Sequence, residues 1–87
     1  MANHKSAEKR MRQALVRRDR NRSARAAMRT EIKKLRTAIE QGNADEAKGM
    51  LASTLGMVDA TAKKGVIHHN AAARTKSRLT RAVNGMA

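Results

Sequence analysis

The sequence contains no cysteine, proline, tryptophan, tyrosine or phenylalanine. Without cysteine there is neither a disulfide framework nor a thiolate zinc site, which fits a reducing compartment. Without aromatic residues, a core must be built from Leu, Ile, Val, Met and Ala, and nucleic-acid bases cannot stack on Phe, Tyr or Trp. Without proline and with few β-branched runs, the 87 residues favour an all-α fold in one small domain, residues 1–87.

Acidic residues are also scarce. The chain has 7 Asp and Glu against 20 Lys and Arg, which gives a net charge of +13 and a pI of about 11.7. Folding has to work against this self-repulsion, and a polyanionic partner would relieve it. Nucleic acid is the most common such partner, and an anionic membrane surface is the second.

Long apolar runs are missing as well. No segment approaches the 18 consecutive apolar residues typical of a membrane span. The stretch MANHKSAEKR has no apolar run after its charges, so we expect no secretory signal. The default expectation is a cytoplasmic protein that does not enter a membrane.

The charge is divided unevenly along the chain. Residues 1–40 hold 13 basic and 4 acidic side chains, residues 41–62 hold 1 and 3, and residues 63–87 hold 6 and 0. Two basic segments therefore flank a middle segment with a slight negative charge, and no acidic side chain follows Asp59.

Capping residues and glycines predict three helices: residues 6–40, 44–64 and 70–84. Ser6 and Asn70 are expected to cap the first and third helices, and Asn43 with Glu46 has the spacing of a capping box for the second. The glycines expected to end the first two helices are Gly42 and Gly65.

The first helix has two different halves. In its second half, apolar residues recur at spacings of four, three and four: Met28, Ile32, Leu35 and Ile39. Followed back toward the N-terminus, the same face becomes polar and carries Arg17 and Arg10. The N-terminal half is basic all round, so we expect it to leave the bundle and lie between phosphate backbones.

The second helix has a broad apolar face, formed by Ala47, Met50, Leu51, Thr54, Leu55, Met57, Val58 and Ala62. Gly49 and Gly56 weaken the helix by about 1 kcal/mol each relative to Ala. Either they allow another backbone to approach closely, or they are simply tolerated.

The third helix also has two faces. Its expected core face consists of Ala72, Leu79, Ala82, Val83 and Met86. The opposite face carries Arg74, Arg78 and Arg81, which we call the arginine ridge. Because no acidic side chain lies nearby in the sequence, we expect the ridge to contact phosphates.

Other chemistry has little support. His68 and His69 are adjacent and lack a Cys, Asp or Glu at ligand spacing, so neither a metal nor a cofactor is expected. Hydrogen bonding of a loop His to phosphate or ribose and plain capping both remain open. The acidic residues of the first helix have cations at helical spacing and are interpreted as local ion-pair partners, not catalytic groups: Glu8, Asp19, Glu31 and Glu40. We expect no enzyme activity.

Three other interpretations of the charge compete with RNA binding: a merely solvated surface, a general DNA-compacting protein and a cationic membrane binder. The segregation of charge and the preference for Arg argue against the first. The lack of a wide apolar face in the basic half argues against the last. Shape recognition of a folded RNA through phosphates and 2′-hydroxyls remains the favoured interpretation.

Three stretches closely resemble bacterial ribosomal protein twenty of the small subunit: MANHKSAEKR, RNRSARAAMRTEIKKLRTAIE and KKGVIHHNAAARTKSRLT. The resemblance covers essentially the whole chain. It implies a three-helix bundle whose long basic first helix extends beyond the bundle. It also implies a structural protein of the cytoplasmic ribosome that binds 16S rRNA early in assembly and bridges the 5′ domain and the long penultimate helix. We expect few protein contacts and no homo-oligomer.

The resemblance also implies RNA-binding residues by position. At the tip of the first helix they are Asn3, Lys5, Ser6, Lys9, Arg10 and Arg12. Along that helix they are Arg17, Arg18, Asn21, Arg22, Arg25 and Arg29. A second surface would consist of His68, Asn70, Arg74, Lys76, Ser77 and Arg78, to which the arginine ridge adds Arg81.

Overall fold

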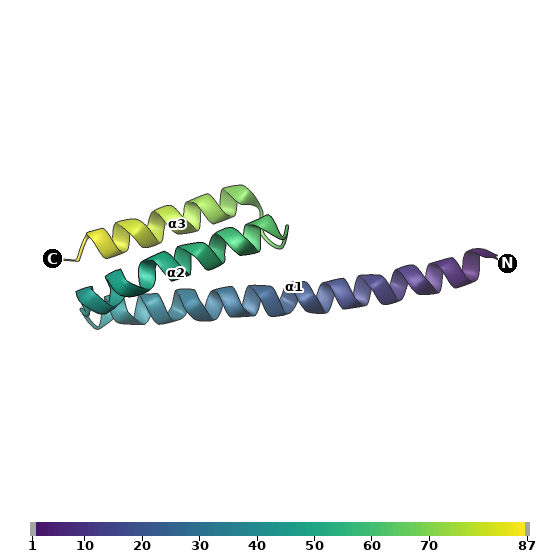
Figure 1. Cartoon of the computed structure of the whole chain (residues 1–87), viewed down its shortest axis with the longest axis horizontal. Helices are drawn as coiled ribbons and strands as arrows, with labels where there is room; N and C mark the ends of the chain where they lie inside the picture. The colour runs from purple at the N-terminus through teal and green to yellow at the C-terminus, as the bar shows by residue number, and fades with distance from the viewer. Residues whose placement is uncertain (1, 87) are drawn as a thin grey trace.

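The computed structural model describes residues 2–86, with side chains described from residue 4 onward. It consists of three helices joined by short turns: α1 (Ala2–Glu40), α2 (Ala44–Lys63) and α3 (His69–Asn84). No strand occurs between residues 2 and 86. The all-α prediction and the long first helix are confirmed (Figure 1).

Both predicted helix-ending glycines are confirmed. Gly42 and Gly65 have φ angles of 74° and 78°, a region that favours glycine because it has no Cβ. At each site the glycine and the residue after it donate backbone N–H groups to the last turn of the helix, as in a Schellman motif. These hydrogen bonds satisfy carbonyls that the helix end leaves without partners.

The predicted N-terminal cap is confirmed in position for α2 and is wrong for α1 and α3. α1 is already helical at Ala2, so Ser6 lies inside the helix. Asn43 precedes α2, but its side chain bonds the Glu46 carboxylate (3.2 Å) and no backbone N–H of the first turn. α3 begins at His69, and its cap is the ring of His68, which accepts from the Asn70 backbone N–H at 3.0 Å.

In the view of Figure 1, α2 lies between α1 and α3. α2 packs along both neighbours, whereas α1 and α3 approach each other only sparingly. The molecule is therefore long and thin, with principal extents of 67 × 21 × 15 Å.

Two small apolar clusters hold the helices together. One contains Leu35 and Ala38 of α1, Ala47 of α2, and Leu79 and Val83 of α3. The other consists of Met28, Val58 and Ala72, one from each helix. The predicted core faces are confirmed apart from Ala82, which is exposed because it lies to one side of the line through Leu79 and Val83.

Two threonines of α2 are buried in this narrow core. Thr54 donates its hydroxyl to the Met50 carbonyl at 3.0 Å, and Thr61 donates to the Met57 carbonyl at 2.7 Å. Burying a hydroxyl is costly unless it is hydrogen-bonded, and these bonds within the helix remove that cost.

Most of the first half of α1 has no other helix beside it (Figure 1). Residues 4–20, which we call the rod, are all exposed and extend beyond α2 and α3 (Figure 1). The rod is about 25 Å long at 1.5 Å per residue. Its large apolar residues Met11, Leu15 and Val16 are 67, 53 and 57% exposed, so the prediction that this half leaves the bundle is confirmed.

The glycines inside α2 do not serve close packing. A Cβ placed at Gly49 or Gly56 would meet no atom within 4 Å. Of the two interpretations of these glycines, simple tolerance is therefore the correct one.

Replacing these glycines should stabilise the fold. Gly49→Ala and Gly56→Ala should each raise the free energy of unfolding by about 1 kcal/mol, because Ala restricts the unfolded chain and fits the open site. For a chain of this size, thermal denaturation should show a rise in Tm of roughly 4–8 °C per substitution. As a control, Gly42→Ala should lower stability because of its positive φ. Unchanged or lower Tm values for both α2 variants would contradict this account.

The rod should be the least protected helix segment of the free protein. It buries no side chain, and its like charges repel at helical spacing. Backbone amides of residues 4–20 should exchange with deuterium much faster than those of residues 28–40 of the same helix. Equal protection in both halves would mean that the rod is stable without a partner.

Candidate nucleic-acid interface

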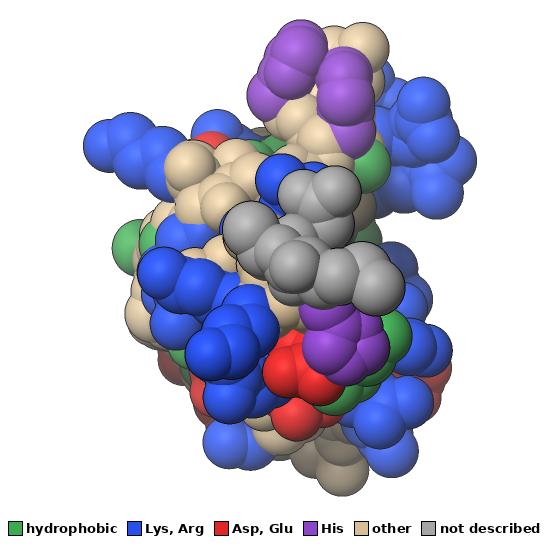
Figure 2. All heavy atoms as spheres, turned by 90° about the vertical axis from the view of Figure 1, so that its right-hand side faces the viewer, with side chains coloured by type: hydrophobic (Ala, Val, Ile, Leu, Met, Phe, Trp, Pro, Cys, Tyr) green, Lys and Arg blue, Asp and Glu red, His purple; other side chains and the backbone are tan. Residues whose placement is uncertain are grey.

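The rod places its cations on several sides. Figure 2, which looks along the molecule from the N-terminal end of α1, shows Lys and Arg side chains at many points around the outline. Most predicted RNA-binding residues of α1 are exposed: Lys5, Ser6, Lys9, Arg10, Arg12, Arg17, Arg18, Arg22 and Arg29. Asn21 and Arg25 are half-buried, and the Asn3 side chain lies outside the described residues.

Few of these charges are balanced within the protein. Glu8 lies 3.2 Å from the His4 ring, and Glu31 lies 3.6 Å from the Lys34 ammonium. Glu31 is an ion-pair partner, as predicted, whereas Glu8 contacts a histidine, which is a cation only when protonated. Among residues 4–86, Asp19 and Glu40 have no cation within 4.0 Å, so the prediction is wrong for them. The guanidinium groups of the rod consequently have no carboxylate partner in the described chain.

The arginine ridge of α3 forms a second basic surface. Arg74, Arg78 and Arg81 are exposed, as is Ser77 between them. The opposite face of α3 is buried through Leu79 and Val83, so the ridge points away from the core.

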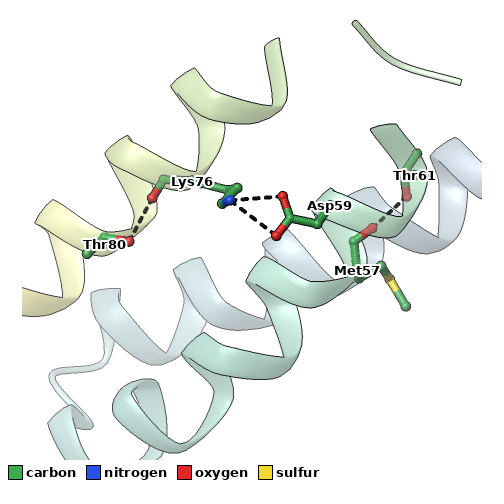
Figure 3. A network of polar contacts seen from close by, with 5 residues as sticks. All are labelled: Met57, Asp59, Thr61, Lys76 and Thr80. Carbon is green, nitrogen blue, oxygen red and sulfur yellow. Dashed lines mark hydrogen bonds and ion pairs between the residues drawn. The ribbon is translucent and has the colours of Figure 1, made fainter. Parts of the chain in front are cut away.

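Lys76 differs from the other predicted contacts on α3. Its ammonium donates to both carboxylate oxygens of Asp59, at 2.9 and 3.1 Å, and so ties α3 to α2 (Figure 3). Its side chain is 37% exposed, and exposed pairs of this kind contribute about 0–1 kcal/mol. Lys76 therefore has a role inside the protein that the sequence did not reveal.

The turn before α3 is organised by two histidines. The His68 and His69 rings stack with centroids 4.1 Å apart, while His68 Nδ1 accepts from the Asn70 backbone N–H. Of the two roles considered for these histidines, capping is confirmed for His68. Within the described residues, no group of three or more His, Cys, Asp or Glu side chains is arranged to hold a metal ion.

A cleft lies where the turn between α2 and α3 meets α1. It has a volume of about 760 Å³ and is lined by Arg17, Arg20, Asn21, Ser23, Ala24, Lys64, Gly65 and Val66. Arg20 and Lys64 were not among the predicted binding residues. Their basic character was visible in the sequence, but only the fold brings positions so far apart into one cleft.

Comparison with known proteins shows the family of this chain. The profile of the family described as ribosomal protein S20 matches residues 2–84. The chain belongs to the ribosomal protein S20 family. Small ribosomal subunit protein bS20 of Thiobacillus denitrificans is 51% identical over the full length of both chains. The protein of that name from Desulforapulum autotrophicum is 53% identical, with 95% of this chain and 99% of the relative covered.

A third relative shows a similar likeness. The bS20 protein of Clostridium beijerinckii is 46% identical over 100% of each chain. The sequence resemblance to this ribosomal protein family is thereby confirmed. Among the residues described, no helix is long and apolar enough to cross a membrane.

The capping role of His68 can be separated from any contact with RNA. His68→Ala should lower the free energy of unfolding by about 1 kcal/mol, because the Asn70 N–H loses its acceptor. His68→Asn supplies another acceptor and should retain most of the stability without the imidazole. Chemical denaturation of the three proteins measures the difference. Wild-type stability of the Ala variant would show that the cap contributes nothing.

Proposed function

We propose that this protein binds 16S rRNA directly through two basic surfaces and bridges its 5′ domain and its long penultimate helix during assembly. Membership of the ribosomal protein S20 family makes it a structural constituent of the small ribosomal subunit and not an enzyme. Its place of action is then the bacterial ribosome in the cytoplasm. Residues 1–87 act as one RNA-binding unit, as a single copy with few protein contacts.

The observation that carries this proposal is the uncompensated charge of the rod. Residues 4–20 include seven Lys and Arg, all exposed, on the half of α1 that extends beyond α2 and α3. A helix with cations on several sides is suited to a space between phosphate backbones, where each side meets a negative surface. On a flat membrane or a single duplex, only one side would be used.

The side chains also indicate how the RNA is recognised. The described surface has no aromatic side chain apart from histidine, so base stacking contributes little. Arginine binds phosphate through two parallel hydrogen bonds, which fixes orientation as well as charge. Contacts with phosphates and 2′-hydroxyls recognise the shape of a folded RNA, which duplex DNA does not share.

The fold supports bridging because the two basic surfaces lie on different helices of one bundle. The arginine ridge faces outward from α3, and α2 separates α3 from α1 (Figure 1). The segment containing α2 has a slight negative charge, so it divides the basic surfaces. A protein that carries cationic surfaces on two different helices can hold two RNA elements together.

A salt titration of binding to a 5′-domain rRNA fragment, with excess duplex DNA as competitor, tests this function. With about 6–10 phosphate contacts, affinity should fall roughly 10³- to 10⁵-fold between 50 and 200 mM salt. A triple variant with Arg74, Arg78 and Arg81 changed to Gln should bind more weakly or give an altered footprint. A Lys48→Gln/Lys63→Gln variant, changed at exposed cations of α2, is the control.

The outcomes separate the proposal from its rivals. Binding that survives the DNA competitor and depends on the arginine ridge supports a site-specific RNA clamp. Equal competition by DNA, together with wild-type behaviour of the triple variant, contradicts it. Co-sedimentation with anionic vesicles, in parallel, should recover little protein because no wide apolar face lies on the rod.

A further inference from the structure

Six cations lie on one face of α1 and cross from the rod into the helical bundle. They follow one another at spacings of four, three, four, four and three residues: Arg18, Arg22, Arg25, Arg29, Lys33 and Arg36. We call this set the basic stripe. Spacings of three and four keep side chains on one side of a helix, so the stripe has about one cation per 5.4 Å turn. Its total length is about 27 Å.

The bundle end of the stripe lies along a groove between α1 and α3. The groove exists because these two helices approach each other only sparingly, and its volume is about 410 Å³. It is lined by Arg29, Ile32, Lys33, Arg36, Thr37 and Glu40 of α1 and by Thr75 of α3. Half of the stripe thus lines a concave site.

The stripe has no anionic partner within the described chain. The nearby acid Glu31 pairs with Lys34, which is not part of the stripe. Glu40, at one end of the groove, makes no ion pair within 4.0 Å among residues 4–86. All six cations are exposed except the half-buried Arg25. Their positive charge is therefore available to a ligand.

Thr75, on the opposite wall of the groove, differs from every other threonine of the described chain. The other five threonines of the chain donate their hydroxyls to the carbonyl four residues earlier: Thr30, Thr37, Thr54, Thr61 and Thr80. Thr75 is half-buried in the groove, and its hydroxyl makes no such bond and has no partner within the described residues. This hydroxyl can donate to a phosphate oxygen or accept from a ribose hydroxyl.

We infer that one RNA strand runs along the basic stripe and that its sugar–phosphate backbone enters the groove between α1 and α3. Lys33 and Arg36 hold phosphates there, and the Thr75 hydroxyl contacts the backbone from the other wall. Arg78, one turn after Thr75 on α3, lies at the outer side of the same wall. The inference rests on the proposed RNA-binding function and adds a third contact region that joins the rod to the arginine ridge.

The charges and shape favour RNA over other occupants. A lone phosphate would need one cluster of cations, whereas these are spread over about 27 Å in a line. An acidic peptide would be expected to have apolar anchors, but the groove contains only Ile32 as a large apolar residue. A polyanion with regular charges and polar sugars matches both the line of cations and the hydroxyl.

The test compares variants with the wild type on a 16S rRNA 5′-domain transcript and on the complete 16S rRNA. Lys33→Gln/Arg36→Gln removes the groove cations, and Lys48→Gln/Lys63→Gln removes the same charge from α2. Thr75→Val removes only the hydroxyl at nearly constant shape. Gln has helix propensity similar to Lys and Arg, so all variants should fold, which circular dichroism and Tm confirm.

The groove variant should lose affinity for at least one RNA by about tenfold per lost contact. Its slope of log affinity against log salt should fall by about two, while the α2 variant stays near wild type. Thr75→Val should weaken binding several-fold without changing the slope. Lys33→Arg/Arg36→Lys keeps both charges, so its slope of log affinity against log salt should stay near the wild-type value.

Equal affinity, slope and backbone footprint for the groove variant, the α2 variant and wild type would overturn the inference. If the Arg74/Arg78/Arg81 variant still loses binding in that case, the proposed function stands without the groove. If no variant loses binding to either RNA, the proposed function fails as well.

Discussion

Every functional feature of this protein depends on a thin apolar contact that works against a net charge of +13. The contact has few large side chains, because Leu35, Leu79, Val58 and Val83 are the principal apolar residues that are fully buried. α2 supplies a partner to both neighbours and has little positive charge, so it can lie between two basic helices without adding to their repulsion. The repulsion between like charges therefore remains at the surface, where a bound polyanion neutralises it.

This arrangement explains why the binding surfaces have the shapes they do. α2 packs along both α1 and α3, which contact each other only sparingly, and the groove between α1 and α3 follows from that geometry. The rod extends because its apolar stripe stops, not because a separate domain begins. Binding to RNA should therefore order the rod and relieve repulsion together, so that folding and assembly are coupled.

Much of the fold could be predicted from local sequence because local rules determine it. The spacing of Met28 and Leu35 marks the buried part of α1, and glycine is required where the first two helices end with positive φ. The sequence did not predict that His68 caps α3, because Asn is a stronger capping residue than His. Only the path of the chain into α3 decides between His68 and Asn70. The tie between Asp59 and Lys76 spans 17 residues and needs the packing of α2 on α3, as does the groove. Periodicity describes one helix at a time, so it cannot reveal what two helices form between them.

Site-directed cleavage of 16S rRNA tests the bridging claim most directly. The chain has no cysteine, so Ala7→Cys on the rod, Ala73→Cys on α3 and Ala52→Cys on α2 each give a single, exposed attachment site for an iron–EDTA probe. The account predicts that the rod and α3 probes cut two different RNA elements, one of them in the 5′ domain, and that the α2 probe cuts little. Cleavage of the same element from both probes, or cleavage no stronger than from α2, would contradict a bridge between two RNA elements.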